Sequence, residues 1–291
     1  MRYLDAAATR QALSMSACIS AMERAFGDDI EVPVRNLLGP SLFMSGRVGD
    51  DTGVKVVSTV PGKPFGIVAV FDADGACRGL VDGPTVTAIR TAAGAGLATR
   101  LLARPDTRTL AMLGAGAMAY DQVMAVTEVR PVDEILVWSR TREHAEVLAE
   151  RVGGTAVADA DEAVAAADVI STATPSRAPL FDAASVRPGT HINAVGAFTP
   201  EMVEIPPGTV RHALVFVDDV AAAAEEAGDL LQAGVEPAGT VGDLLADRME
   251  GRTSDTQVTF FKSVGIASQD VAAATVALQA AEKMGLGVEL G

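Results

Sequence analysis

The spacing of apolar residues changes character along the first third of the chain. Residues 5–26 carry apolar side chains at helical spacing, which predicts a helix there. Residues 30–82 break into short β-rich runs separated by Gly, Pro and Asp turns, and the segment DADG at 72–75 is typical of a hairpin turn. We therefore expect a small, mostly antiparallel sheet in this region.

A regular strand–helix alternation follows. A helix is predicted over 84–106, because Pro84 lies in its first turn and Pro105 ends it. The tail from 266 to 285 predicts one more amphipathic helix. Strands are expected at 109–113, 134–139, 154–158, 168–174, 190–196 and 213–219, with helices at 117–129, 141–152 and 159–167. Such alternation with short links predicts an α/β fold of Rossmann type, a doubly wound parallel sheet.

A glycine turn lies between the first predicted strand of this region and the helix that follows it. In LGAGAMAYDQ, Gly114 and Gly116 let the backbone approach a ligand closely, and Ala119 is small enough to replace the third glycine often found there. The same turn without a ligand is the plainer alternative, but its strand–turn–helix context favours a dinucleotide pyrophosphate. The cofactor-binding candidates here are Gly114, Gly116, Ala117 and Met118.

The end of the next strand indicates which dinucleotide is bound. The residues at that position are Ser139, Arg140 and Thr141, where an NAD site usually carries an acid for the ribose hydroxyls. A cation suits the 2′-phosphate of NADP(H), so NADP(H) is favoured. NAD(H) stays open, since Arg140 also fits a surface ion pair.

Composition narrows the class of partner. The chain has 23 Lys and Arg against 38 Asp and Glu, a formal charge of −15, which disfavours nucleic acid and anionic membranes as partners. Two separated cysteines, and the lack of a signal or membrane-spanning stretch, indicate a reduced, cytoplasmic protein. The three histidines form no cluster, so we expect no metal.

Several motifs, taken in order, resemble the ornithine cyclodeaminase/mu-crystallin family over nearly the whole chain. They are GVKVVSTVPG, GLVDGPTVTAIRTAAGAGLAT, LGAGAMAYDQ, VWSRT, HINAVGAFTPEMVEI and VTFFKSVGIASQD. The resemblance implies a mixed α+β substrate and dimerisation domain over 1–104, completed by 265–291. It also implies a dinucleotide-binding Rossmann domain over 105–264.

The resemblance also implies roles for particular residues. Arg35 corresponds to an arginine that clamps a substrate carboxylate, and Lys55 to a lysine at the reacting end of the pocket. Arg90 corresponds to an arginine that reaches the cofactor phosphates, and Val264 closes over the substrate. The segment from Asn193 to Gly196 lines the nicotinamide side, and Thr174 joins the cofactor-binding candidates.

Two departures from the family pattern matter. Ornithine cyclodeaminases carry an Asp where this chain has Phe198, a substrate-binding candidate whose ring cannot shuttle protons. A cyclodeaminase is therefore disfavoured. The loop after Pro61 is short, so we do not transfer substrate size from relatives.

The chemistry of Arg35 and Lys55 agrees with these roles. An arginine fork binds carboxylate in a bidentate way, and a buried lysine acquires a pKa suited to proton transfer. A surface ion pair for Arg35 and exposure for Lys55 are the plainer alternatives. Glu225, Glu226 and Asp229 are expected on a solvated helix face, whereas Asp218 lies at a strand end.

These observations predict an NAD(P)H-dependent reductase of a small cyclic ketimine carboxylate, such as 1-pyrroline-2-carboxylate or 1-piperideine-2-carboxylate. Lys55 is the catalytic candidate. The alternatives are an amino-acid dehydrogenase of alanine-dehydrogenase type, an ornithine or lysine cyclodeaminase, and a cofactor-loaded binding protein of crystallin type. Because an antiparallel sheet with unpaired edges favours pairing with a second copy, we expect a homodimer.

Overall fold

The structure is a computed structural model that describes residues 1–60, 62 and 65–291. The chain divides into two compact units, Met1–Ala93 with Gly265–Gly291, and Gly94–Val264. The division falls inside α3 (Gly83–Leu102) rather than at 104/105. The expectation about the short loop and the pocket falls on Pro61, Lys63 and Pro64, which lie outside the described residues.

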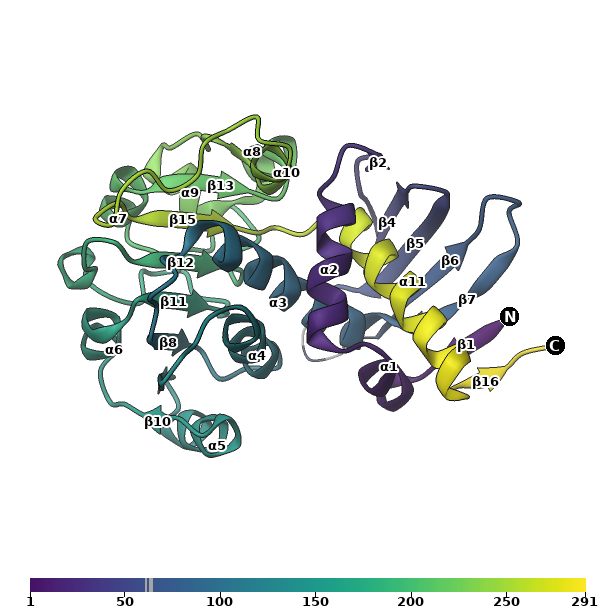
Figure 1. The fold of residues 1–291 in the computed structure, drawn as a ribbon, viewed down its shortest axis with the longest axis horizontal. Coiled ribbons are helices and arrows are strands. Elements are labelled where there is room, and N and C mark those ends of the chain that lie inside the picture. Colours follow the sequence, from purple (N-terminus) through teal and green to yellow (C-terminus); the bar gives the residue numbers. More distant parts are fainter. Residues whose placement is uncertain (61, 63–64) are drawn as a thin grey trace. The chain divides into compact units, whose positions relative to one another are not determined.

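The first unit is built on a mixed sheet in which β1 pairs with β7 in parallel and all other pairs are antiparallel. Its order is β16-β1-β7-β6-β5-β4-β2, with β3 beside β4 (Figure 1). The expected mostly antiparallel sheet is confirmed, and DADG joins β6 to β7 with Gly75 at φ +77°. The strands are β1 (Arg2–Leu4), β2 (Ile30–Glu31), β3 (Asn36–Leu38), β4 (Ser41–Val48), β5 (Asp51–Ser58), β6 (Gly66–Phe71), β7 (Cys77–Asp82) and β16 (Val288–Glu289).

One face of this sheet is covered by the predicted C-terminal helix, α11 (Ala267–Met284), which contacts β4 to β7. Gly53 permits this approach, since a Cβ there would lie 2.9 Å from Val271 Cγ2. The single helix expected over 5–26 is two helices, α1 (Ala6–Ala12) and α2 (Met15–Ala25). The break has a local cause, because the Ser14 hydroxyl accepts the Ala17 N–H (3.3 Å) and caps α2.

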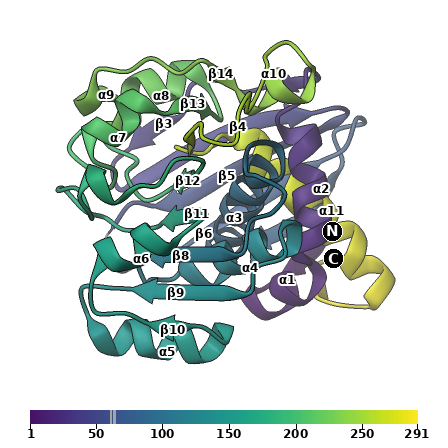
Figure 2. The same ribbon diagram turned by 60° about the vertical axis from the view of Figure 1, so that its left-hand side comes forward.

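The second unit contains an all-parallel sheet of order β10-β9-β8-β11-β12-β15-β13-β14 (Figure 2). This confirms the predicted doubly wound α/β fold. β15, which lies between β12 and β13, was not predicted as a strand. The strands are β8 (Thr109–Leu113), β9 (Glu134–Trp138), β10 (Thr155–Ala156), β11 (Val169–Thr172), β12 (His191–Ala194), β13 (Leu214–Val217), β14 (Gly239–Thr240) and β15 (Thr259–Lys262).

Helices connect these strands, and alanine and valine side chains from them fill the core against the sheet. Between β12 and the C-terminal helix only one helix was expected, around Glu225, Glu226 and Asp229, because the helices there are each only one or two turns long. The helices are α4 (Ala119–Val129), α5 (Arg142–Val152), α6 (Ala160–Ala166), a 3₁₀ turn η1 (Ala183–Ser185), α7 (Pro207–His212), α8 (Val220–Glu226), α9 (Gly228–Ala233) and α10 (Val241–Leu245).

Two half-buried arginines stabilise the C-terminal end of α3. The Arg130 guanidinium donates to the carbonyls of Arg100 and Ala103, each at 2.9 Å, and Arg252 Nε donates to the carbonyl of Leu102 at 2.8 Å. These donors satisfy the carbonyls that a helix end leaves without partners. Within the described ranges, no helix has the length and apolarity needed to cross a membrane.

His191 is fully buried at the start of β12. Its Nε2 lies 3.1 Å from Asn193 Oδ1 and its Nδ1 lies 2.9 Å from the Thr259 hydroxyl. Burial lowers the pKa of His191 to about 3, so the imidazole stays neutral at ordinary pH. His191 therefore has a structural role among the core strands.

Folding stability should depend on pH through His191. The unfolded chain binds a proton near pH 6.5 and the folded chain only near pH 3, so acidification over this interval favours unfolding. Between pH 6.5 and 5 the lost stability is about 2 kcal/mol. Urea unfolding of wild type and His191→Gln at both pH values measures it, and the variant should lose about 2 kcal/mol less. Equal losses in the two proteins would contradict the assignment.

Candidate functional site

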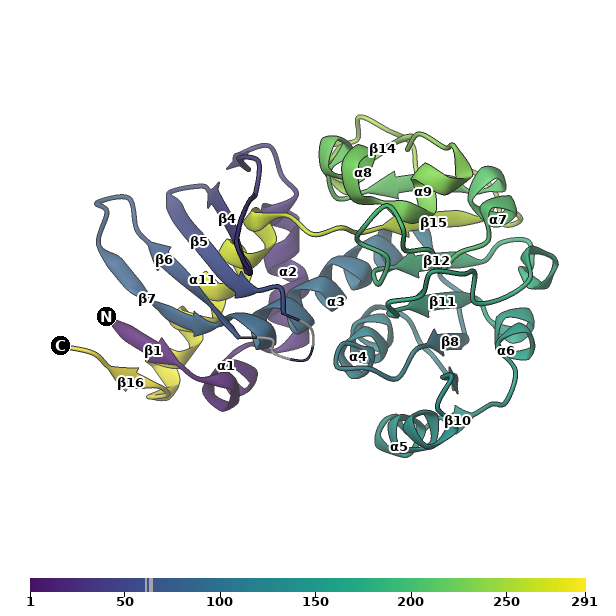
Figure 3. The same cartoon turned by 180° about the vertical axis from the view of Figure 1, so that it is seen from behind.

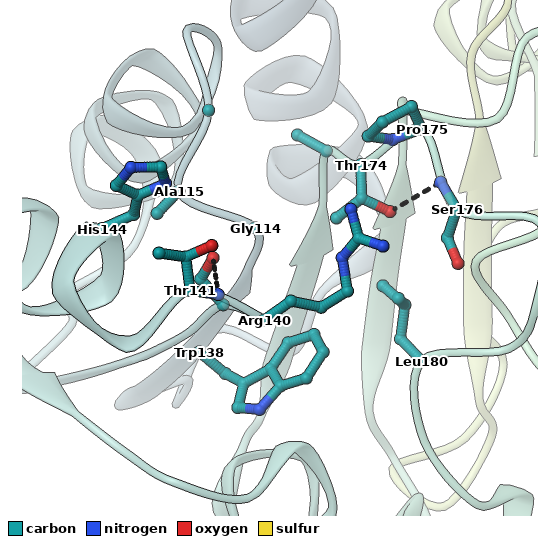
Figure 4. A pocket seen from close by; sticks show the side chains of 13 residues that line it. Gly114, Ala115, Trp138, Arg140, Thr141, His144, Thr174, Pro175, Ser176 and Leu180 are labelled. Carbon is teal, nitrogen blue, oxygen red and sulfur yellow. Dashed lines mark hydrogen bonds between the residues drawn. The ribbon is translucent and has the colours of Figure 1, made fainter.

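A pocket of about 290 Å³ lies at the carboxyl ends of β8, β9 and β11 in the second unit (Figure 4). This is the edge of a parallel sheet at which α/β proteins bind their ligands. Its lining comes from three loops and the start of α5: Gly114, Ala115, Gly116, Trp138, Ser139, Arg140, Thr141, His144, Ala173, Thr174, Pro175, Ser176 and Leu180.

Gly114 and Gly116 of the turn are glycine for different reasons. Gly114 has φ +111°, and a Cβ there would lie 2.8 Å from Thr174 Cγ2, so folding alone requires it. Gly116 has no such requirement, because a Cβ on it would meet nothing within 4 Å and its φ is ordinary. Gly116 is exposed beside the pocket, so the close approach of a bound molecule explains it better than packing does.

The N-terminus of α4 carries no side-chain cap hydrogen bond in the described structure. α4 begins at Ala119, two residues later than predicted, and Ala117 and Met118 form the turn before it. Ala119 itself is fully buried, which agrees with its replacing a packing glycine. Uncapped N–H groups and the helix dipole favour an anion at this end, so the turn and α4 suit a pyrophosphate.

The residues that follow β9 line the part of the pocket that the glycine turn and α4 do not form. Arg140 extends into the pocket toward Thr174, and Thr141 and His144 lie nearer Ala115 (Figure 4). The lining residues include no Asp or Glu. Ser139 accepts the Thr141 N–H (3.3 Å). The pocket wall therefore offers hydroxyls, an arginine and a histidine, and no carboxylate for ribose hydroxyls.

Thr174 and Gly196 meet at a buried carboxylate. The Thr174 N–H donates to Glu204 Oε1 (2.6 Å), and the Gly196 N–H donates to Oε2 (2.8 Å). Gly196 must be glycine, since a Cβ on it would clash with the Thr174 backbone. The Asn193 side chain faces the core, where its Nδ2 donates to the Thr99 hydroxyl (2.8 Å).

The position of Asp229 differs from the one expected from the sequence. It is fully buried rather than on a solvated helix face, and its Oδ2 lies 2.9 Å from Lys262 Nζ, which is also fully buried. The local pattern was misleading because α8 ends at Glu226 and α9 starts at Gly228, which turns Asp229 inward. Glu225 is exposed and Glu226 is half-buried.

Val264 and Phe198 occupy different surroundings. The Val264 N–H donates to Asp218 Oδ2 (3.0 Å), and the Ser263 hydroxyl donates to the same oxygen (2.8 Å). Asp218 therefore fixes the turn that carries Val264. Phe198 lies in the loop after β12 and is 51% exposed.

The first unit holds a buried cluster of charge. Lys55 Nζ lies 2.7 Å from Asp270 Oδ2, and Arg90 Nε donates to Asp270 Oδ1 (3.0 Å). Lys55 is 4% exposed and Asp270 is 1% exposed. Lys55 is thus on the helix-covered face of β5 with Gly53, as strand alternation predicts, and not on the surface.

Arg35 joins this cluster from the chain between β2 and β3. Its Nη2 donates to the Gly265 carbonyl (2.6 Å). A Cβ on Gly265 would lie 2.7 Å from Arg90 Nη1, so the Arg90 guanidinium packs against the same residue. Three cations therefore converge near one carboxylate. The prediction that Arg90 reaches cofactor phosphates stays a prediction, because its Nε and Nη1 donate to Asp270 and Gln269.

Burial and charge set the protonation of this cluster. Burial lowers the pKa of Lys55 to about 8, Asp270 opposes that shift, and the Arg90 and Arg35 charges add to it. Burial alone would raise the pKa of Asp270, but Arg90 and Lys55 hold it below its usual range. At neutral pH the cluster is therefore cationic overall, with a lysine close to its titration range. Such a cluster can bind a small carboxylate and transfer a proton.

Among the buried charged or amide side chains, sequence reasoning missed six: Asp121, Gln122, Glu204, Lys262, Gln269 and Asp270. A signal existed for two of them, since SQD interrupts the otherwise apolar start of the C-terminal helix. Glu204 and Lys262 lie in segments whose strands and short helices were not predicted. Across the described residues, no group of three or more His, Cys, Asp or Glu could hold a metal ion.

Comparison with known proteins shows chains of similar sequence and fold. The mouse ketimine reductase mu-crystallin is 36% identical over 219 residues, which cover 75% of this chain and 69% of that protein. Among solved structures, Thermococcus litoralis Δ¹-pyrroline-2-carboxylate reductase, in complex with NADH and L-proline, has a TM-score of 0.93 and 29% identity, with each chain fully covered. An archaeal alanine dehydrogenase dimer with bound NAD has a TM-score of 0.92 and 27% identity, covering 100% of this chain and 99% of that one.

A family description matches a large, continuous part of the chain. The match runs from residue 51 to residue 284 and so includes Lys55, the glycine turn and Asp270. The chain belongs to the ornithine cyclodeaminase/mu-crystallin family.

Proposed function

We propose that this protein reduces a small cyclic ketimine carboxylate with NADPH. The observation that carries the proposal is the buried cluster in which Lys55, Arg90 and Arg35 converge near Asp270. The relatives named ketimine reductase and Δ¹-pyrroline-2-carboxylate reductase support it. The first unit then binds the substrate and the second binds the dinucleotide.

The substrate carboxylate is held by the cations that Asp270 leaves in excess. Arg35 is half-buried and its planar fork suits bidentate carboxylate binding, while Asp270 restrains Lys55 and Arg90. When bound, the reduced nicotinamide supplies the hydride that the imine carbon accepts. The imine nitrogen takes up one proton, so that C=N becomes CH–NH.

Lys55 is the group in this chain best suited to supply that proton. Its pKa of about 8 leaves it protonated at neutral pH and able to regain a proton from water after each turnover. The same group, once neutral, accepts a proton when the reaction runs toward the imine. Phe198 offers no such chemistry, which argues against a cyclodeaminase.

An amino-acid dehydrogenase is the second candidate, favoured by the similarity to the archaeal alanine dehydrogenase. It would use the same cluster and dinucleotide pocket on an open-chain imino acid. Rates with 1-pyrroline-2-carboxylate, 1-piperideine-2-carboxylate, and pyruvate plus ammonia, each followed by NADPH absorbance, separate the two. Consumption with pyruvate and ammonia but with neither ketimine would overturn the ketimine proposal.

Replacing Lys55 should abolish most of the reduction. In Lys55→Met we expect kcat for ketimine reduction to fall by roughly 100-fold or more, the contribution usual for a general acid. Dinucleotide affinity should stay near wild type, because the pocket that we assign to it lies in the second unit. Steady-state rates and fluorescence titration with NADPH measure the two quantities, and turnover at the wild-type rate would contradict the assignment.

The rate should also depend on pH through Lys55. Since Lys55 is protonated below about pH 8, kcat/KM for reduction should fall as pH rises through that value. Asp270 raises the pKa of Lys55, so Asp270→Asn should shift this decline to lower pH. An unshifted profile in that variant would show that another group controls the rate.

The choice of dinucleotide should depend on Arg140. We propose that it binds the 2′-phosphate, because it extends into a pocket whose lining offers no carboxylate (Figure 4). Arg140→Asp should shift the ratio of kcat/KM for NADPH and NADH toward NADH by about 100-fold. Arg142→Asp, on the exposed neighbouring position of α5, is the control and should leave the ratio unchanged. An unchanged ratio in Arg140→Asp would refute the role.

We also propose a homodimer formed by the first unit. α11 covers one face of its sheet, and Figure 3 views the sheet from the side opposite to that of Figure 1. On the face away from α11, the strand register pairs Phe43 of β4 with Val56 of β5, and Val56 with Ile67 of β6. Ile67 is 39% exposed, and nearby Leu38 and Phe65 are 73% and 76% exposed. An apolar surface of this kind is typical of a subunit interface.

A charge on that face should separate the subunits. Ile67→Lys should give a monomer by light scattering coupled to size exclusion, whereas wild type gives a dimer. Val147→Lys is the matched control, because Val147 is an exposed apolar residue of α5 in the second unit. A dimeric Ile67→Lys protein would place the interface elsewhere.

A further inference from the structure

Three charged side chains lie together in the interior of the second unit without a part in the proposed chemistry. Glu204, Asp229 and Lys262 are each 0% exposed. Burying charged groups is costly unless their partners are well placed, so a carboxylate pair and a lysine in an alanine-rich core need an explanation. Their hydrogen bonds provide one.

Glu204 joins the two loops that follow β11 and β12. Its Oε1 accepts the Thr174 N–H (2.6 Å), and its Oε2 accepts the N–H groups of Gly196 (2.8 Å) and Ala197 (3.2 Å). These are bonds from neutral donors to a charged acceptor, which are stronger than ordinary backbone bonds. One side chain therefore fixes the spacing of two loops at the carboxyl edge of the sheet.

The main chain next to Glu204 supports the same wall of the dinucleotide pocket. The Leu180 N–H donates to the Glu204 carbonyl (2.9 Å), and the Val203 N–H donates to the Ser176 carbonyl (2.9 Å). Thr174, Ser176 and Leu180 all line the pocket, and they lie together on one side of it (Figure 4). The position of this wall thus depends on residues 203 and 204.

Asp229 and Lys262 hold Glu204 in place. Asp229 Oδ1 accepts the Glu204 N–H (2.7 Å) and the Ile205 N–H (2.9 Å), and its Oδ2 pairs with Lys262 Nζ at 2.9 Å. Lys262 is the last residue of β15, a central strand of the sheet. Burial raises the pKa of Glu204, and the Lys262 charge opposes that rise. The carboxylate is thereby anchored to the rigid part of the unit.

We propose that Glu204 is a positioning residue for dinucleotide binding, which acts by holding the loops after β11 and β12 at a fixed spacing. The inference rests on the proposed function, because it takes the pocket to be the dinucleotide site. Glu204 itself contacts no part of the ligand in this account. Its carboxylate fixes Thr174, and Thr174 forms part of the pocket wall.

A matched control lies in the same unit, at the amino ends of the strands, opposite to the pocket. Asp168 accepts the backbone N–H groups of Arg108 (2.8 Å) and Thr109 (3.1 Å) and pairs with Arg104 (3.0 Å). It also precedes β11, whereas Thr174 follows that strand. Asp168→Asn therefore makes the same carboxylate-to-amide change at a side chain that accepts backbone N–H groups and does not line the pocket, although it also weakens the ion pairs of Asp168 with Arg104 and Arg187.

The test compares wild type, Glu204→Gln and Asp168→Asn. We expect Glu204→Gln to raise the Kd for NADPH by about tenfold or more, and Asp168→Asn to leave it within about twofold, by calorimetry. In the ligand-free proteins, hydrogen exchange should show faster exchange at residues 173–176 and 195–198 in Glu204→Gln only. The thermal midpoints of both variants report any general loss of stability.

The possible results distinguish a failure of the proposed function from a failure of the role proposed for Glu204. If wild type binds neither NADPH nor NADH, the proposed function fails and this inference fails with it. If wild type binds but Glu204→Gln binds equally well, or both variants weaken binding equally, only this inference is overturned. Should Glu204→Gln not fold, Glu204→Asp keeps the charge but shortens the side chain by one methylene group, so the carboxylate no longer reaches both Thr174 and Gly196 as Glu204 does. Wild-type affinity in that variant would overturn the inference.

Discussion

The pairing of Asp270 with Lys55 and Arg90 is the interaction on which the buried charge cluster of the first unit depends. The three groups are almost fully buried, and two cations without a counter-ion in that position would cost several kcal/mol. A single carboxylate on α11 stabilises them and leaves a net positive charge. Because α11 comes from the end of the chain and β5 from its beginning, the cluster forms only when both ends have folded together.

In the second unit, the groups that suit a pyrophosphate are backbone N–H groups rather than charged side chains. Parallel strands deliver their loops to one edge, where a glycine turn and the start of α4 suit an anion. Loops at such an edge have few strand partners of their own. Buried carboxylates supply the missing acceptors at Thr174 and Gly196, and Asp218 does the same for Ser263 and Val264. The loops at the carboxyl ends of the strands are thus held in place by buried carboxylates such as Glu204 and Asp218. The alternation of apolar and polar residues along the chain does not indicate these side chains.

The sequence predicts some parts of the fold and of the candidate site and misses others, depending on whether the signal is local or comes from residues far apart in the chain. The burial of Lys55 was expected from the family resemblance and not from its neighbours in sequence. Local signals were sufficient for the glycine turn and for most strands of the parallel sheet, though not for β15, because each depends on a few consecutive residues. They failed at Ser14, where a capping hydroxyl interrupts a helical pattern, and at Asp229, where a turn between two short helices reverses the face. Asp270 and Glu204 were missed because their partners lie far away in sequence, about 180 and 30 residues for Arg90 and Thr174.

Gly116 has a consequence beyond binding. Gly114 is favoured by its backbone angle and by the nearness of Thr174, so any other residue at this position would strain the fold. Gly116 has open space before it and an ordinary backbone angle, so the fold would survive a methyl group there. If a lineage lost its need for the ligand, residue 116 would be free to drift while residue 114 stayed constant. The pair therefore distinguishes selection on folding from selection on binding within three residues of one another.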